Sequence, residues 1–161
     1  MGRRVGLEVP GPGGPAPQPL LGELRPVTGP LPATRGAFPP ARVAGDVVHV
    51  SGTRARRAAD TIEGATVTDD GMVRRDAGGQ SAAVLANVER VLTEVGLDRT
   101  DLVDVTAFLV DVDDFDAWNE AWTGFFNGAE APARTTVAVL ALPHPHLLVE
   151  VKATARLRDR D

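Results

Sequence analysis

Apolar residues recur at helical spacing in the middle of the chain and alternate with polar residues near its end. Between Gln80 and Val95 an apolar residue returns every third or fourth position, which predicts an amphipathic helix that Gly96 ends. A second helix is expected to begin after Asp113 or Asp114, either of which can serve as its N-cap. At helical spacing, an aromatic stripe is more often core than a ligand cradle. This second helix carries such a stripe at Phe115, Trp118, Trp122, Phe125 and Phe126.

Runs of β-branched and aromatic residues predict strands around these helices. Asp70-Gly71 lies between two short β-forming stretches and predicts a hairpin turn. In the last run, period-2 alternation places Glu150 on the face opposite Val149 and Val151. The predicted strands, including the two arms of the hairpin, cover 43–50, 66–68, 72–73, 102–110, 135–141 and 147–157.

The order of these elements is β, β, β, α, β, α, β, β, which indicates an α+β fold. Two helices are expected to cover one face of a mixed sheet, and oligomerisation is expected to bury the other face. Eight of the thirteen prolines fall in residues 1–33, which we predict to be an extended or partly disordered arm. The folded domain is predicted to span 34–161.

Composition narrows the classes of function. A chain of 161 residues with 43% hydrophobic residues fits one domain, and a net charge of −5 argues against a general nucleic-acid binder. The absence of cysteine excludes disulfides and thiolate chemistry. No apolar run is long enough for a membrane span, and the N-terminus is a poor secretion signal, so a cytoplasmic location is expected.

Several polar residues leave two interpretations open. Arg54, Arg56 and Arg57 lie in a predicted basic loop over 53–60, which could clamp an anion or be a solvated loop. His144 and His146 lie in a proline-rich connector that cannot be regular structure. Three histidines in the whole chain make a metal site an unfavoured interpretation, and none is predicted.

Arg134 and Glu150 are the candidate catalytic pair. Arg134 opens one predicted strand and Glu150 interrupts the apolar pattern of the next. A guanidinium can hold a carboxylate by two parallel hydrogen bonds, and a carboxylate can orient and deprotonate water. Periodicity alone equally fits a glutamate paired to a neighbour on a polar strand face.

A resemblance to a known family favours the catalytic interpretation. From Arg35 to Arg156, about three-quarters of the chain, the sequence resembles the Rid (YjgF) family of reactive intermediate deaminases. The segments that carry the resemblance are Val50-Ser51-Gly52, Asn87-Val88, Thr106–Val110, Phe115 with Trp118-Asn119, Phe125-Phe126, Pro132-Ala133-Arg134 and Val149-Glu150-Val151.

Within that family the sequence looks closest to the 2-aminomuconate deaminases. Three blocks are similar to that group, and the last is the most specific: Arg35-Gly36 with Phe38-Pro39, Ser51-Gly52-Thr53 with Arg56-Arg57, and Arg134–Val139 with Leu142–Leu148.

The resemblance implies a chorismate-mutase-like fold and a homotrimer with active sites between subunits, without a metal or organic cofactor. It places the carboxylate-binding arginine on Arg134, the water-handling glutamate on Glu150 and a backbone contact on Gly52. Phe38 stands where the family often has tyrosine, so that hydroxyl is missing, and Thr136 replaces a frequent cysteine.

The expected activity is hydrolysis of 2-aminomuconate, or a close dicarboxylate relative, to the 2-oxo acid and ammonia. Arg56 or Arg57 would then hold the distal carboxylate, and His144 and His146 would donate a proton, bond the substrate or only shape the connector. Two alternatives remain open: a general deaminase for 2-aminoacrylate-type imines, and a repurposed protein of the same fold that steers a reactive intermediate in biosynthesis.

Overall fold

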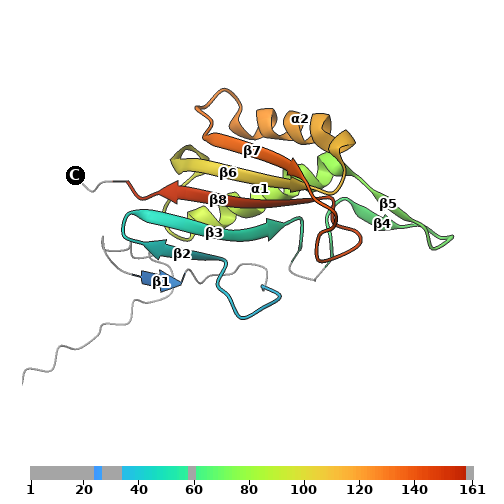
Figure 1. Ribbon diagram of the computed structural model, residues 1–161, viewed down its shortest axis with the longest axis horizontal. Helices are drawn as coiled ribbons and strands as arrows, with labels where there is room; N and C mark the ends of the chain where they lie inside the picture. Colours follow the sequence, from blue (N-terminus) through green and yellow to red (C-terminus); the bar gives the residue numbers. More distant parts are fainter. Residues whose placement is uncertain (1–23, 27–33, 58–60, 159–161) are drawn as a thin grey trace, which may run out of the picture.

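The computed structural model describes residues 24–26, 34–57 and 61–158, and its centre is a twisted sheet (Figure 1). The order across the sheet is β1-β2-β3-β8-β6-β7, and all neighbours are antiparallel except the parallel pair β6 and β7. Its strands are β1 (Leu24–Pro26), β2 (Ala41–Ala44), β3 (Val47–Arg54), β6 (Leu102–Leu109), β7 (Ala133–Ala138) and β8 (Val149–Arg156).

Two helices lie together on one face of this sheet (Figure 1). Helix α1 (Ala77–Thr93) begins three residues before the predicted start because the Asp76 side chain accepts a hydrogen bond from the Gly79 N–H. Helix α2 (Phe115–Phe126) provides the crossover that a parallel β6/β7 pair requires. Asp114 makes no side-chain cap there, so the predicted capping was wrong; Asp111 instead caps the short 3₁₀ turn before it.

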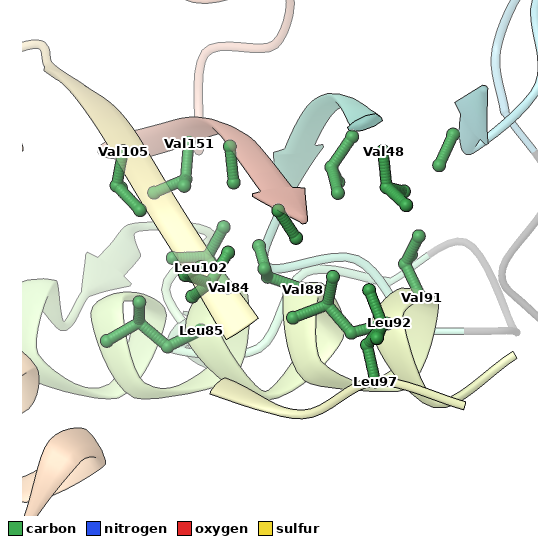
Figure 2. Close-up of a cluster of buried hydrophobic side chains, with 14 of the residues drawn as sticks. Val48, Val84, Leu85, Val88, Val91, Leu92, Leu97, Leu102, Val105 and Val151 are labelled. Carbon is green, nitrogen blue, oxygen red and sulfur yellow. The ribbon is translucent and has the colours of Figure 1, made fainter. Parts of the chain in front are cut away.

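The core fills the space between the helices and the sheet, as Figure 2 shows for α1. Val84 and Val88 of α1 pack towards Val105 and Val151 of the sheet, all with almost no exposed surface. The aromatic stripe of α2 is also largely core, since Trp118, Trp122 and Phe126 are buried. Phe125 packs against this core, and Phe115 stays exposed.

The structure corrects three predictions about the strands. Residues 43–50 form two strands, because Gly45 turns the chain at a φ of 65° between β2 and β3. Strand β3 continues past Gly52 to Arg54, with a shift of register against β8 between Val50 and Thr53, so Arg54 is not in a loop. The last two strands are shorter than predicted, at Ala133–Ala138 and Val149–Arg156.

The N-terminal segment contributes an edge strand. Leu24–Pro26 forms β1 and pairs with β2, so this part of the predicted arm is extended and joined to the sheet. The rest of 1–33 lies outside the described residues. The hairpin of β4 (Ala65–Val67) and β5 (Val73–Arg75) was predicted, and it forms a separate two-stranded sheet that turns at Gly71.

No helix covers the second face of the sheet within the described ranges (Figure 1). Side chains on this open face include Lys152 and Arg156 of β8 and His49 of β3, all exposed. Neither described helix has the length and apolar content needed to cross a membrane.

Candidate functional site

Glu150 lies on the open face of the sheet and forms an ion pair with Arg54. The two residues are direct cross-strand neighbours on β8 and β3, and Arg54 Nε donates to Glu150 Oε2 at 2.5 Å. Both side chains are mostly shielded, with exposures of 18% for Arg54 and 16% for Glu150. Val149 and Val151 point the other way into the core, as the alternation predicted. The carboxylate is therefore held in one orientation by its own chain.

Gly52 makes room for that carboxylate. A Cβ at Gly52 would overlap Glu150 Oε1, and the irregular register of β3 against β8 begins beside it. A bulge of this kind re-aims side chains and is common next to active sites. The absence of a side chain thus lets Glu150 lie against the β3 backbone.

Asn87 of α1 fixes the backbone at the end of β3, just after Gly52. Its Nδ2 donates to the carbonyl oxygens of Arg54 and Arg56, at 2.8 and 3.0 Å, and its Oδ1 accepts from Arg90 Nη1 at 2.8 Å. The side chain is nearly buried. One amide therefore ties the end of β3 to the helix layer and holds the strand that carries Arg54.

A small hollow of about 70 Å³ lies beside this part of β3. Phe38 lines it and is 42% exposed, and Ser51 donates from Oγ to the Pro39 carbonyl at 2.7 Å, which ties the Phe38 loop to the strand. Ligand pockets usually measure a few hundred Å³ or more. This hollow beside β3 is thus small for a ligand site.

Arg134 lies on the opposite face of the sheet, on the outermost strand β7. Its register partner is the buried Val105, and its guanidinium stacks on Trp122 at 4.9 Å and lies 6.0 Å from the Phe115 ring. Such distances allow cation–π attraction. Arg134 Nη1 is buried and has no hydrogen-bond partner among the described residues.

Thr136, two residues further along β7, also has a buried polar atom. Its Oγ1 is buried and also lacks a hydrogen-bond partner in the described part of the chain. We call Arg134, Thr136 and Trp122 the arginine half-site, and Gly52, Arg54 and Glu150 the glutamate half-site. One chain does not bring the predicted pair Arg134 and Glu150 together, because they point to opposite faces of the sheet.

The histidine connector is fixed through its backbone. Gln80 of α1 is fully buried; its Nε2 donates to the His146 carbonyl at 2.7 Å and its Oε1 accepts from the Leu148 N–H at 2.9 Å. The His146 N–H donates to His144 Nδ1 at 3.1 Å, and the two rings meet edge to face. No group of three metal-ligating side chains converges in the described residues.

The two arginines predicted to hold a distal carboxylate both line a second hollow, of about 510 Å³, next to Asn87 and Arg90. Arg57 is exposed and pairs with Glu63. Arg56 is half-buried and also lines the small hollow beside β3, again together with Asn87.

Sequence reasoning gave Asn87 and Gln80 no role in the site, and it considered Arg54 only as one of three arginines in a basic loop that could clamp an anion. Arg54 meets Glu150 across 96 positions of sequence, and no local pattern signals such a pair. Asn87 and Gln80 are buried polar residues of the helix predicted as amphipathic. Their helical spacing from Val84 places them on its apolar stripe, and this was the signal that could have identified them.

Comparisons with known proteins agree with this architecture. A family model described as Endoribonuclease L-PSP matches residues 29–157. The RutC family protein YoaB of Escherichia coli K12 is 39% identical over 80 residues, covering 50% of this chain and 69% of that protein. The 2-iminobutanoate/2-iminopropanoate deaminase of Salmonella typhimurium is 34% identical over 87 residues, covering 53% and 67%.

Among solved structures, YyfA of Yersinia pestis, described as a member of the conserved Rid protein family, superposes with a TM-score of 0.71 at 26% identity. The match covers 84% of this chain and all of YyfA. Since the family model spans most of the chain and the whole sheet-and-helix unit is shared, the chain belongs to the Rid/YjgF family, also called the L-PSP family.

Proposed function

We propose that this protein hydrolyses 2-imino acids, or the enamines that tautomerise to them, to 2-oxo acids and ammonia. The observation that carries the proposal is the Glu150 carboxylate, which Arg54 holds in place against Gly52. The similarity to a 2-iminobutanoate/2-iminopropanoate deaminase supports this class of reaction.

We propose that each active site forms between two subunits of a homotrimer. Two observations support this: Arg134 and Glu150 lie on opposite faces of one sheet, and no helix among the described residues covers the open face. The arginine half-site of one subunit would meet the glutamate half-site of the next. Arg134 Nη1 and Thr136 Oγ1 are buried and have no hydrogen-bond partner among the described residues, and both would then gain one.

In this arrangement Arg134 binds the carboxylate next to the imine carbon, and stacking on Trp122 keeps its planar guanidinium oriented. Glu150 orients a water molecule and takes one of its protons as the oxygen attacks the imine carbon. The resulting carbinolamine is protonated on nitrogen, the C–N bond breaks and ammonia leaves. Loss of the hydroxyl proton then gives the 2-oxo acid.

Imines are reactive towards water, so orientation of the two reactants supplies much of the required acceleration. The role of Phe38 is to pack on the substrate, and that of Gly52 is to offer backbone polar groups beside Glu150. His144 and His146 keep two candidate roles, as proton donor to the leaving amine or as a fixed element of the connector.

We further propose a dicarboxylate substrate of the 2-aminomuconate type. The feature that favours it over a general imine deaminase is the set of cations near Glu150, namely Arg54 on the strand and Arg56 just beyond it. Arg57 is the weaker candidate because Glu63 already neutralises it.

The test is ammonia release from enzymatically generated 2-aminomuconate and, separately, from 2-aminoacrylate. We expect Glu150→Gln to lower the catalysed rate by about 10²- to 10⁴-fold, the usual range for loss of a general base. Arg134→Ala should abolish turnover of both substrates.

Turnover of 2-aminoacrylate alone would identify the general deaminase. Release of ammonia from neither substrate by the wild type would contradict the proposed hydrolase and leave a repurposed scaffold.

A further inference from the structure

We propose that Arg54 is a specificity-determining residue that contacts the substrate's second carboxylate and Glu150 at the same time. This inference rests on the proposed function, because it assigns the second carboxylate to one residue of the same site. It goes beyond the sequence-based candidates Arg56 and Arg57, and it gives Arg54 a second role as the positioning residue of Glu150.

The first support is the way in which Arg54 uses its guanidinium. The group has three nitrogens along two edges, and its hydrogen bond to Glu150 uses Nε. Neither Nη atom donates to a protein oxygen among the described residues. An outer edge of two parallel N–H groups matches a carboxylate, which it can bind bidentately.

The second support is the rigidity of the Arg54 backbone. Its carbonyl is bonded to Asn87, and Arg90 in turn fixes the Asn87 amide. The Arg54 side chain is only 18% exposed, so its head group has little freedom. A pre-organised cation loses less side-chain entropy when it binds a ligand, and this favours affinity.

The third support is the charge balance. In the free protein Arg54 and Glu150 neutralise each other, and one of the two arginines predicted for the task, Arg57, is paired with Glu63. A substrate carboxylate on the Nη edge would share the positive charge with Glu150. Substrate recognition and placement of the water-handling carboxylate would then depend on the same guanidinium.

The experiment measures binding separately from chemistry. The probes are muconate, which has two carboxylates and no nitrogen, and hexa-2,4-dienoate, which has the same carbon chain and one carboxylate. Isothermal titration gives the dissociation constant of each for the full chain, its Arg54→Ala variant and its Arg54→Lys variant. Wild type should prefer muconate by about 10- to 100-fold, the range expected for one charge-assisted bidentate contact.

Arg54→Ala should remove this preference while hexa-2,4-dienoate binding changes little. Arg54→Lys keeps the charge but has no second edge, so it should still pair with Glu150 yet lose most of the muconate preference. The matched control is Arg156→Ala, which removes an exposed cation on the same strand as Glu150 that pairs with Asp46. It should keep the preference.

A muconate preference that survives in Arg54→Ala would overturn the inference. If the alanine variant does not fold, Arg54→Lys decides: an unchanged preference overturns the inference, and a reduced one supports it. Failure of the proposed function has a different signature, because wild type would then release no ammonia whatever its muconate preference.

Discussion

The glutamate half-site and the arginine half-site differ in how completely one chain satisfies them. Glu150 has its ion pair, its space against Gly52, and a strand tied down by Asn87. Arg134 has the Trp122 and Phe115 rings beside its guanidinium, and, like Thr136, it has a buried polar atom that lacks a hydrogen-bond partner in the described chain. Buried polar groups in native proteins are nearly always bonded. The contrast indicates that the glutamate half-site finds its partners within one chain, whereas the arginine half-site needs a ligand or a neighbouring subunit to supply them.

The largest expected effect comes from mixing two inactive variants. Glu150→Gln and Arg134→Ala should each lack activity, but co-expressed chains should form trimers in which some interfaces combine an intact Glu150 with an intact Arg134. Random assembly gives about a quarter of the wild-type activity if adjacent subunits supply the two residues. Ammonia release from purified mixed trimers measures this, and no recovery would mean that both residues act within one subunit.

Gly52→Ala tests how much the glutamate half-site depends on close approach. The added methyl overlaps Glu150 Oε1, so the carboxylate or the strand must move. We expect turnover to fall by about 10- to 100-fold, because small misplacements of a catalytic group are costly, and stability to fall by about 1–3 kcal/mol.

The control is Gly124→Ala in α2. A Cβ there meets nothing, and alanine favours a helix over glycine by up to about 1 kcal/mol, so this variant should be as stable as wild type or more so. Equal effects of the two substitutions would contradict the role given to Gly52.

The two half-sites can also be compared through two hydroxyl groups, one next to the glutamate half-site and one in the arginine half-site. Ser51 Oγ donates to the Pro39 carbonyl, whereas Thr136 Oγ1 has no partner in the described chain. In the dissociated subunit, Ser51→Ala should cost about 1 kcal/mol of unfolding free energy, and Thr136→Val should cost none or be stabilising. Denaturant titration at low protein concentration measures both. A larger loss for Thr136→Val would mean that its hydroxyl is already bonded within the subunit.

The smallest effect is expected far from both half-sites, at Arg158. Hydrogen bonds from the Thr100 hydroxyl and N–H, and then from Arg158, lower the pKa of Asp98 to about 2. A lowered folded-state pKa stabilises the protein above the unfolded value near 3.8, and this contribution is lost as the pH falls towards 2.

Because these groups are half exposed, Arg158→Ala should cost about 0–1 kcal/mol. Thermal unfolding at pH 7 and pH 2 measures it. The difference from wild type should shrink at the lower pH, and a difference that grows on acidification would contradict the assignment.

Local patterns predicted the parts of the fold whose causes are local. The helical spacing of Val84 and Val88 and the alternation around Glu150 report burial directly, and the structure confirms both. The turn at Gly45 was missed because β-forming residues continue on both sides of it. The family resemblance named Arg134 and Glu150 as partners, but their placement on opposite faces depends on strand order and register.

The Arg54–Glu150 pair was not predictable for the same reason. Its two members come from strands that are adjacent in space and 96 residues apart in sequence, with both helices between them. The register shift between Val50 and Thr53 decides which residue of β3 faces Glu150. Without that shift, period-2 counting would assign the wrong side chain to the site.

The hydrogen bonds of the buried Gln80 amide limit where residues can be inserted into the chain or deleted from it. The amide bonds the His146 carbonyl and the Leu148 N–H at a fixed spacing. An insertion or deletion between Leu142 and Leu148 would leave this buried amide without its partners. The turn at Gly71 carries no such constraint, because a Cβ there meets open space, so added residues should be tolerated. Of these two loops, only the turn of the β4–β5 hairpin should therefore accept an inserted peptide.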